Sequence, residues 1–145
     1  MVVFKNFNYS ASNDAKILIL GSMPGDKSLR RQEYYGHPRN LFWEIMGHMF
    51  NFDNSATSYD SKLDILKQNK FALWDVLSEC KRKGSLDSNI ETASTEPNNF
   101  PMFLRVHSNI HSIFFNGKKA EELFRRLVIK KCLLNDFSLN FHSMP

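Results

Sequence analysis

Cysteine is scarce in this chain. Cys80 and Cys132 are the two cysteines among 145 residues, and they lie far apart, without the CxxC spacing of a metal-ligand pair. Two such cysteines cannot build a four-thiolate zinc site or an iron–sulfur cluster. His107 and His111 have a metal-like spacing, but no further ligands accompany them. We therefore predict no metal site and no cofactor, and the lack of a disulfide framework favours a reducing, cytoplasmic setting.

Long apolar runs are absent as well. No stretch approaches the ~20 consecutive apolar residues of a membrane-spanning helix, and residues 1–14 lack the basic and apolar regions of a secretion signal. The length of 145 residues is typical of one domain, and a hydrophobic share of 42% is typical of a globular protein. The sequence thus predicts one soluble domain, 1–145, without membrane contact, which we expect to be monomeric.

The charge balance is mildly basic. The formal net charge is +4 and the isoelectric point is ≈ 9.1. Such a balance suits a polyanionic partner such as nucleic acid, although many basic proteins bind none.

Apolar runs alternate with helical patterns along the chain. Residues 16–20 form a short run of the kind that is buried on both faces of a parallel sheet. Further strands are predicted at 70–77, 112–116 and 136–142, and helices at 40–50, 61–69, 101–106 and 118–131. This alternation predicts an α/β sandwich with a largely parallel sheet.

The same pattern predicts local details. Ser61 is the expected N-cap of the helix that follows it. Residues 1–14 are expected to form an edge strand or arm, and the polar stretch 79–100 is expected to be a long functional loop. The helix at 40–50 is expected to turn one apolar face inward, made of Leu41, Phe42, Ile45, Met46, Met49 and Phe50.

The segment after residues 16–20 carries the most distinctive motifs. These are GSMPG at 21–25 and YYGHPRNLFW at 34–43. Glycine and proline end the predicted strand at its carboxyl end, which is where ligands bind in open α/β sheets. A loop this long, with two tyrosines, a histidine, an arginine and an asparagine, is more typical of a binding site than of a connector.

The two motifs together resemble the uracil-DNA glycosylase superfamily, and within it the hypoxanthine-DNA glycosylase branch, which is related to the mismatch-specific uracil glycosylases. LWDVL at 73–77, CKRKGSLDS at 80–88 and FFNG at 114–117 resemble the same family in the same order. The resemblance covers residues 16–145. Several separated blocks in the same order are more specific than any single motif.

This resemblance implies a fold, an activity and a partner. The fold would be a three-layer α/β/α sandwich with a largely parallel central sheet. The activity would be that of a DNA glycosylase in base excision repair, which flips a deaminated base, hypoxanthine or uracil, out of DNA and hydrolyses its N-glycosidic bond. We expect a monofunctional enzyme, because no residue can be assigned as an amine nucleophile that forms a Schiff base.

Tyr35 is the candidate for stacking on the flipped base. In the mismatch-specific enzymes an aromatic residue stands five positions before the asparagine of the HPxN block, and Tyr35 stands five before Asn40. Stacking on an aromatic ring contributes about 1–3 kcal/mol per base and tolerates different bases. The alternative is a tyrosine packed against its own loop.

Asn40 is the candidate catalytic residue. The mismatch-specific enzymes carry a water-positioning asparagine in their first motif, where this chain has Met23, whose thioether is only a weak acceptor. The resemblance to the hypoxanthine branch implies that the asparagine of HPRN, Asn40, takes this role. An asparagine directly before a helical pattern is also an ordinary N-cap, and both roles are compatible.

Asn116, at the end of the third predicted strand, resembles the base-reading asparagine of the superfamily. An amide has both a donor and an acceptor, so it can pair with the lactam edge that uracil and hypoxanthine share. The alternative is a simple turn, because Asn116-Gly117 is a common turn pair.

Further residues of these blocks are candidates for contacts with the base or with DNA. The backbone of the first motif would approach the ligand and offer N–H groups to an oxygen or phosphate. His37 and Arg39 either contact a phosphate or the leaving base, or lie on the surface; Ser85 and Asp87 either lie near the pocket or bond within a turn. The candidates for base binding in the first motif are Gly21, Ser22 and Met23, and the candidates for DNA or pocket contact are Pro24, Gly25, His37, Arg39, Ser85 and Asp87.

The family's second motif, a Pro-Ser-Thr-Ser-Pro-Ala-Asn-like segment after the last strand, has no counterpart before the sequence stops at Pro145. That loop would enter the minor groove and fill the gap left by the flipped nucleotide, so we expect weak DNA binding and slow turnover without it. Because of Met23 and this missing loop, the alternative function of a non-catalytic module that binds damaged or flipped bases stays open. A hydrolase of small nucleosides or nucleotides would need a phosphate-gripping Gly-Lys pair or an acidic metal cluster, and the sequence has neither.

Overall fold

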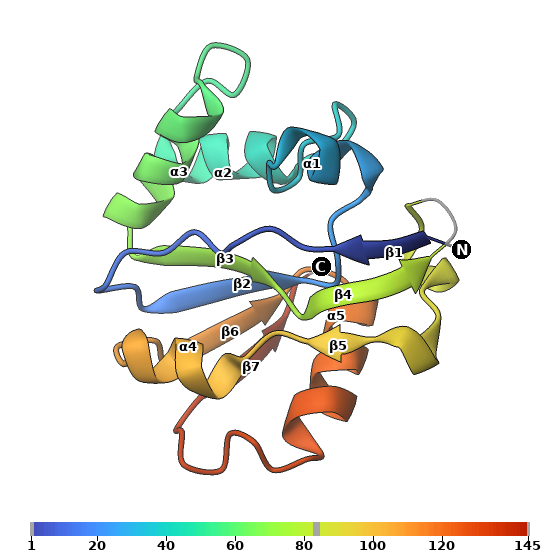
Figure 1. Ribbon diagram of the computed structural model, residues 1–145. Coiled ribbons are helices and arrows are strands. Elements are labelled where there is room, and N and C mark those ends of the chain that lie inside the picture. The colour runs from blue at the N-terminus through green and yellow to red at the C-terminus, as the bar shows by residue number, and fades with distance from the viewer. Residues whose placement is uncertain (1, 83–84, 145) are drawn as a thin grey trace.

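A four-stranded parallel sheet forms the centre of the protein (Figure 1). The computed structural model describes residues 2–82 and 85–144. The spatial order of the strands is β3-β2-β6-β7. Their bounds are β2 Ile17–Gly21, β3 Phe71–Asp75, β6 Ser112–Phe115 and β7 Asn140–Ser143. The middle of β2 is fully buried between its neighbours, as its continuous apolar run predicts.

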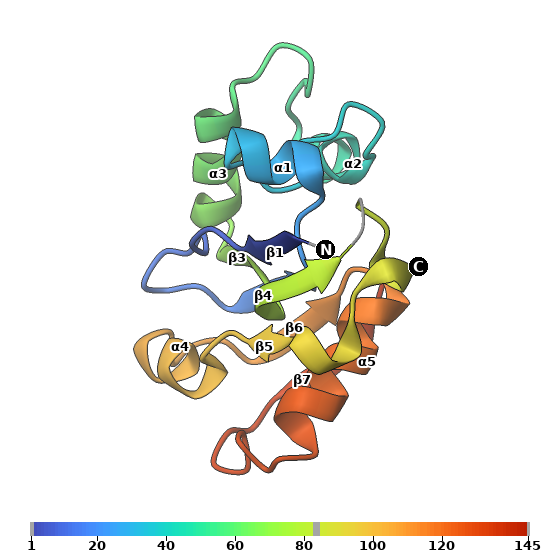
Figure 2. The same cartoon turned by 45° about the vertical axis from the view of Figure 1, so that its right-hand side comes forward.

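Helices cover both faces of this sheet. Figures 1 and 2 show α1, α2 and α3 on one face, and α4 and α5 on the other. Their bounds are α1 Asp26–Arg31, α2 Phe42–Phe50, α3 Tyr59–Gln68, α4 Phe100–Val106 and α5 Lys118–Phe124. α5 continues into one π-helical segment, Arg125–Ile129. The arrangement is a three-layer α/β/α sandwich with a parallel central sheet, so the predicted fold class is confirmed.

A small antiparallel sheet lies beside the carboxyl end of β3. It contains β1 Val2–Lys5, β4 Leu77–Arg82 and β5 Glu96–Pro97 in the order β1-β4-β5. The expected edge strand near the N-terminus is therefore confirmed as β1. The expected irregular loop over 79–100 is wrong in part, because β4 occupies its first residues, with the short 3₁₀ turns Asp87–Asn89 and Thr92–Ser94 farther along. β4 is polar in sequence, and its hydrogen bonds come from strands distant in the chain.

The predicted inward face of α2 is also wrong in part. Phe42, Trp43 and Met46 are buried, whereas half of the predicted face is exposed. The exposed members are Leu41, Ile45 and Met49. The Trp43 indole lies on the buried side of the helix, and its Nε1–H donates a buried hydrogen bond of 2.7 Å to the Tyr34 carbonyl oxygen.

The starts of α3 and β7 differ from the sequence prediction. α3 begins one turn early, because the N-cap is Ser58, whose hydroxyl accepts a hydrogen bond from the Ser61 backbone N–H at 3.2 Å. β7 begins only at Asn140, because a turn closed by the Phe137 N–H and the Leu134 carbonyl oxygen precedes it.

Across 2–82 and 85–144, the structure contains no helix whose length and apolar character would suit a membrane crossing.

Candidate active site

A cavity of about 450 Å³ opens where β2, β3 and β6 end. The strands run parallel, so their carboxyl ends meet at one edge of the sheet, and the loops that leave them surround the cavity. The predicted site residues that line it are Gly21, Ser22, Met23, Pro24, Gly25, Tyr35, His37, Asn40, Ser85, Asp87 and Asn116. These residues come from four blocks that are far apart in the sequence, and the fold brings them together.

Arg39 is the predicted site residue that does not line this cavity. Its side chain is exposed, and its backbone N–H donates a hydrogen bond of 3.0 Å to Nδ1 of His37. Arg39 therefore lies on the protein surface and does not contact the space inside the cavity.

The floor of the cavity is a close approach of three residues. A Cβ atom on Gly21 would lie 2.4 Å from Oδ1 of Asp75 and 3.2 Å from the hydroxyl of Tyr35. Only glycine leaves room for these two polar groups at this point. Gly21 and Asp75 are paired in register at the ends of neighbouring strands, so the sheet itself sets the contact.

Asp75 is a functional candidate that sequence reasoning missed. Its side chain is only 3% exposed, and Nδ2 of Asn6 donates a hydrogen bond of 3.1 Å to its Oδ2. Burial raises the pKa of the Asp75 carboxyl to about 7, and this shift is opposed by the Asn6 hydrogen bond. Its position in the sequence was the signal that could have identified it. Asp75 is the last residue of a buried strand, and Asn116, which was predicted, directly follows another strand.

Tyr35 is the third residue of this floor. Its backbone is left-handed, with φ of 55°. Its ring stacks on Phe42, with ring centroids 4.0 Å apart and an angle of 28° between the planes. Burial raises the pKa of the Tyr35 hydroxyl above its usual value, the Asp75 carboxyl raises it further, and the Asn116 side chain opposes the shift. Phe42 covers one face of the Tyr35 ring, so stacking on a ligand is left to the other face.

Asn40 lines the cavity, but the alternative role of an N-cap is wrong, because Leu41 is the N-cap of α2. Its Oδ1 accepts a hydrogen bond of 2.9 Å from the Phe42 backbone N–H, at the start of α2. This bond orients the amide and leaves its NH₂ group available as a donor. This local hydrogen bond is compatible with the predicted catalytic role of Asn40.

Asn116 follows β6 directly. Its backbone N–H donates a hydrogen bond of 2.8 Å to the Leu20 carbonyl oxygen, which holds the residue against the end of β2. Its half-buried side chain is near enough to the buried Tyr35 hydroxyl to oppose the rise in the pKa of Tyr35, but the two groups form no hydrogen bond. Gly117 then turns the chain into α5 with φ of 108°. Asn116 therefore belongs both to a turn and to the cavity wall.

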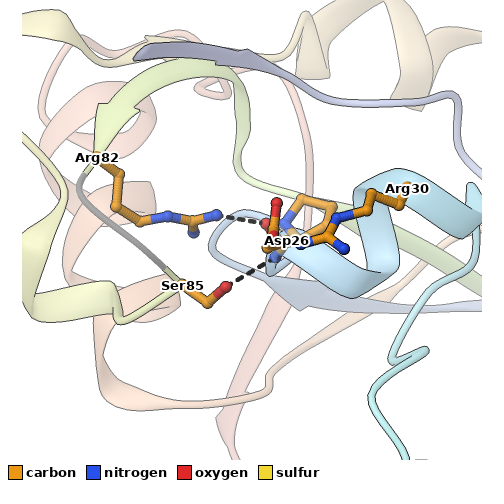
Figure 3. A network of polar contacts seen from close by, with 5 residues as sticks. Asp26, Arg30, Arg82 and Ser85 are labelled. Atoms are coloured by element: carbon orange, nitrogen blue, oxygen red, sulfur yellow. Dashed lines mark hydrogen bonds and ion pairs between the residues drawn. The ribbon is translucent and has the colours of Figure 1, made fainter. Parts of the chain in front are cut away.

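The segment after β4 holds the first motif in place. The Ser22 hydroxyl donates to Oδ1 of Asp87 at 2.6 Å, and the Asp26 backbone N–H donates to the Ser85 hydroxyl at 2.8 Å. The buried Arg82 guanidinium donates to the Pro24 carbonyl oxygen at 2.8 Å. Figure 3 shows Arg82 and Ser85 pointing toward the start of α1, where Asp26 pairs with Arg30. Ser85 and Asp87 thus support the cavity wall from a distant part of the chain.

The donor set of the cavity is that of a site for an organic ligand. Carboxyl, amide, hydroxyl and backbone groups alternate with aromatic rings and the buried Met23. Over the parts of the chain that the structure describes, no three histidine, cysteine, aspartate or glutamate side chains converge as metal ligands.

The comparisons with known proteins point to one family. A family model described as the uracil DNA glycosylase superfamily matches residues 7–140. A hypoxanthine DNA glycosylase from Methanosarcina barkeri is 42% identical over 109 residues, which are 75% of this chain and 68% of the relative. A hypoxanthine DNA glycosylase from Methanosarcina acetivorans is 39% identical over 121 residues, which are 83% of this chain and 75% of the relative.

A solved structure agrees with these relatives. The solution NMR structure of a Methanosarcina acetivorans protein, provisionally described as a uracil DNA glycosylase, superposes with a TM-score of 0.80 at 34% identity. The superposition covers 99% of this chain and 84% of that one. The family match over most of the chain and the two curated relatives lead to one conclusion: the chain belongs to the uracil DNA glycosylase superfamily, a family of DNA glycosylases.

Proposed function

We propose that this protein is a monofunctional DNA glycosylase that excises hypoxanthine, and uracil as a second substrate, in base excision repair. The observation that supports this most is the convergence of Tyr35, Asn40 and Asn116 on one cavity of about 450 Å³. That volume lies in the range of about 300–1,000 Å³ typical of small-molecule sites. The two curated relatives, which are named hypoxanthine DNA glycosylases, favour hypoxanthine as the main substrate.

The base must first leave the duplex, because its glycosidic bond is shielded inside the stack. Tyr35 receives the flipped base on the ring face that Phe42 does not cover. The Phe42 contact holds the tyrosine ring before the base arrives, so little side-chain entropy is lost on binding.

Asn116 reads the base by its lactam edge. Its amide offers an acceptor to the N–H and a donor to the carbonyl oxygen of hypoxanthine or uracil. Adenine and cytosine present the opposite polarity, so with the amide held in this orientation both of its hydrogen bonds would be lost. A buried polar group left without a partner costs about 1–3 kcal/mol, which is the source of the discrimination.

Asn40 positions the attacking water at the sugar. The C1′–N bond breaks with its electron pair on the base, the water oxygen bonds to C1′, and the water proton ends on the released base. The hydrogen bond from the Phe42 N–H fixes Oδ1 of Asn40, so the amide is oriented before the reaction. Its exposed position at the cavity edge gives it access to solvent water.

DNA is the partner in this proposal. The net charge of +4 favours approach to phosphates, and exposed His37 and Arg39 lie at and beside the cavity for a backbone contact. We further propose that the protein acts as a monomer in the cytoplasm.

A non-catalytic reader of damaged bases is the second candidate. Met23 favours it, because this buried thioether stands where mismatch-specific enzymes carry a water-positioning asparagine. The two candidates share the cavity and differ in whether Asn40 replaces that asparagine.

Base release separates the two candidates. Duplexes that carry inosine, uracil or neither are incubated with the protein, and abasic sites are measured by alkaline cleavage. We expect release from inosine DNA, weaker release from uracil DNA and none from the unmodified duplex. Asn40→Ala should slow release about 10²–10³-fold while DNA binding is kept. Asn13→Ala, at an exposed turn away from the cavity, is the matched control. Binding without release by the wild-type protein would favour the reader.

A further inference from the structure

The carboxyl of Asp75 is a buried titratable group in the cavity to which the mechanism above gives no role. It lies at the end of β3, lines the cavity and is 3% exposed. Its Oδ1 occupies the space beside Gly21 where any other residue would place its Cβ. A ligand that reaches the cavity floor at Gly21 therefore meets this carboxyl oxygen and the Tyr35 hydroxyl.

Among the residues that the structure describes, Arg82 is the cation that acts on the polar surroundings of the Asp75 carboxyl, and Lys27 lines the same cavity. Asn6 and the Gly21 backbone donate hydrogen bonds to the carboxyl, and Asn98 donates to the Asp75 main-chain oxygen at 2.8 Å. The charged and titratable groups that act on the carboxyl or respond to it are Arg82 of β4, Asp87 of the first 3₁₀ turn, Tyr34 and Tyr35 of the loop before α2, and Tyr59 of α3. Arg82 is the only cation in this set, and its guanidinium donates to the Pro24 carbonyl oxygen.

We propose that Asp75 contacts the flipped base as a neutral carboxylic acid, and that its O–H donates a hydrogen bond to the base carbonyl oxygen. This inference rests on the proposed glycosylase function and adds a residue to it. The contact is made at the floor, beside Gly21, while Tyr35 stacks on the ring and Asn116 reads the edge. Asp75 is then a catalytic residue, because it touches the atom on which charge develops.

The charge of the leaving base explains why the proton matters. As the C1′–N bond breaks, negative charge spreads onto the base carbonyl oxygen, and an O–H donor aimed at it becomes a stronger hydrogen bond. The proton stays on Asp75 throughout, and the base takes its proton from the attacking water. An ionised carboxylate in the same place would accept only, and it would repel the developing anion. Because burial raises the pKa of Asp75 to about 7, the acid form is present at and below neutral pH.

The opposite role for Asp75 makes an opposite prediction. A carboxylate that activated water or stabilised the sugar cation would work only when ionised, so release would rise with pH up to about 7. An amide at position 75 would then be inactive, because it cannot accept a proton at neutral pH. For a neutral donor, an amide is a working replacement of almost the same shape.

The test is single-turnover release of hypoxanthine between pH 5.5 and 9. We compare wild type, Asp75→Asn, Asp75→Ala and the matched control Asp64→Asn, which changes an exposed aspartate of α3. The wild-type rate should fall about tenfold per pH unit above pH 7, and the Asp64→Asn rate should follow it. Asp75→Asn should stay within several-fold of wild type at pH 6 and lose this fall. Asp75→Ala should be slower by about 10²-fold or more.

Two results overturn the inference and leave the proposed function standing. One is a wild-type rate that rises toward pH 8 together with an inactive Asp75→Asn. The other is an Asp75→Asn profile that keeps the full wild-type fall above pH 7. Circular dichroism of each variant excludes misfolding as the cause, and Asp75→Asn keeps the test valid if Asp75→Ala does not fold. Binding of inosine DNA without release at any pH, by the wild-type protein, overturns the proposed function and this inference with it.

Discussion

The aromatic ring of Tyr35 lies on that of Phe42, with 4.0 Å between centroids and 28° between planes. Tyr35 holds this position with a left-handed backbone, φ 55°, which is uncommon for a residue with a side chain. A strained residue at a cavity wall is typical of a functional position, where the surrounding packing maintains the conformation. Phe42 supplies that packing from the first turn of α2.

Removal of the Tyr35 ring should therefore weaken base capture. Tyr35→Ala should slow hypoxanthine release about 10- to 100-fold, which corresponds to the ~1–3 kcal/mol of base stacking. Tyr35→Phe keeps the ring and should lose much less. The comparison is made by single-turnover release from inosine DNA, with thermal unfolding of each variant as the check on folding. Equal losses for the two variants would show that the hydroxyl, and not the stacking face, carries the role.

Gly21 should tolerate no side chain. Gly21→Ala places a Cβ 2.4 Å from Oδ1 of Asp75, so the carboxyl or the strand end must move. We expect a stability loss of about 1–3 kcal/mol, typical of overpacking, and a loss of base release of at least tenfold. Urea unfolding and release assays measure the two effects. For stability, Gly25→Ala is the control, because its Cβ would meet Ser85 only at 3.4 Å, an ordinary contact. A Gly21→Ala protein with wild-type release would contradict the close-packed floor.

The stability of the protein should respond to pH through Asp75. Its pKa is about 7 in the folded state against 3.8 for the free group, so the folded state holds a proton that the unfolded state loses first. The contribution of Asp75 to stability is therefore fully present below pH 4, falls as the pH rises toward 7, and is lost above it. Relative to Asp75→Asn, wild type should lose roughly 4 kcal/mol at most between pH 4 and pH 8. Urea unfolding of both proteins across this range measures the difference, and a constant difference would contradict the raised pKa.

Arg82 should couple the first motif to Asp75. Arg82→Met keeps most of the buried stem and removes the guanidinium that donates to the Pro24 carbonyl oxygen. Loss of a hydrogen bond from a charged donor costs about 1.5–3 kcal/mol, so the variant should be less stable by that amount.

The positive charge of Arg82 lowers the pKa of Asp75, so its removal should raise that pKa. The fall in release should then begin at a higher pH in Arg82→Met than in wild type. Arg105→Met, at an exposed position of α4, should change neither the stability nor the pH profile. An Arg82→Met protein with the wild-type profile would show that Asp75 does not sense this charge.

The sequence predicted the elements whose signal is local. β2 was recognised as a continuous apolar run, and it is buried on both sides as expected. β4 was missed because its residues alternate weakly and its hydrogen bonds come from β1 and β5, which are distant in the chain. The face of α2 was misplaced because Leu41, Ile45 and Met49 fit a helical stripe as well as the buried residues do. The tertiary contacts of Phe42 and Trp43 favour the observed rotation, and sequence periodicity does not reveal them.

The candidate site shows the same division. Motif blocks identified eleven of the residues that line the cavity, because loops after parallel strands converge at one edge of the sheet. Arg39 was included because it stands inside a motif, but the residue is exposed and does not line the cavity. Asp75 was passed over because it stands inside an apolar block, and its burial against Gly21 depends on the register of two strands.

Base release from inosine DNA by wild type and Asn40→Ala tests the central claim most directly. Matched duplexes with inosine, uracil or an ordinary base are incubated with excess protein, and the abasic product is followed over time while a filter or mobility assay records binding. The account predicts release of hypoxanthine by wild type, about 10²–10³-fold slower release by Asn40→Ala, and similar DNA binding by both. Release that is unchanged in Asn40→Ala, or no release by folded wild-type protein that binds the inosine duplex, would contradict it.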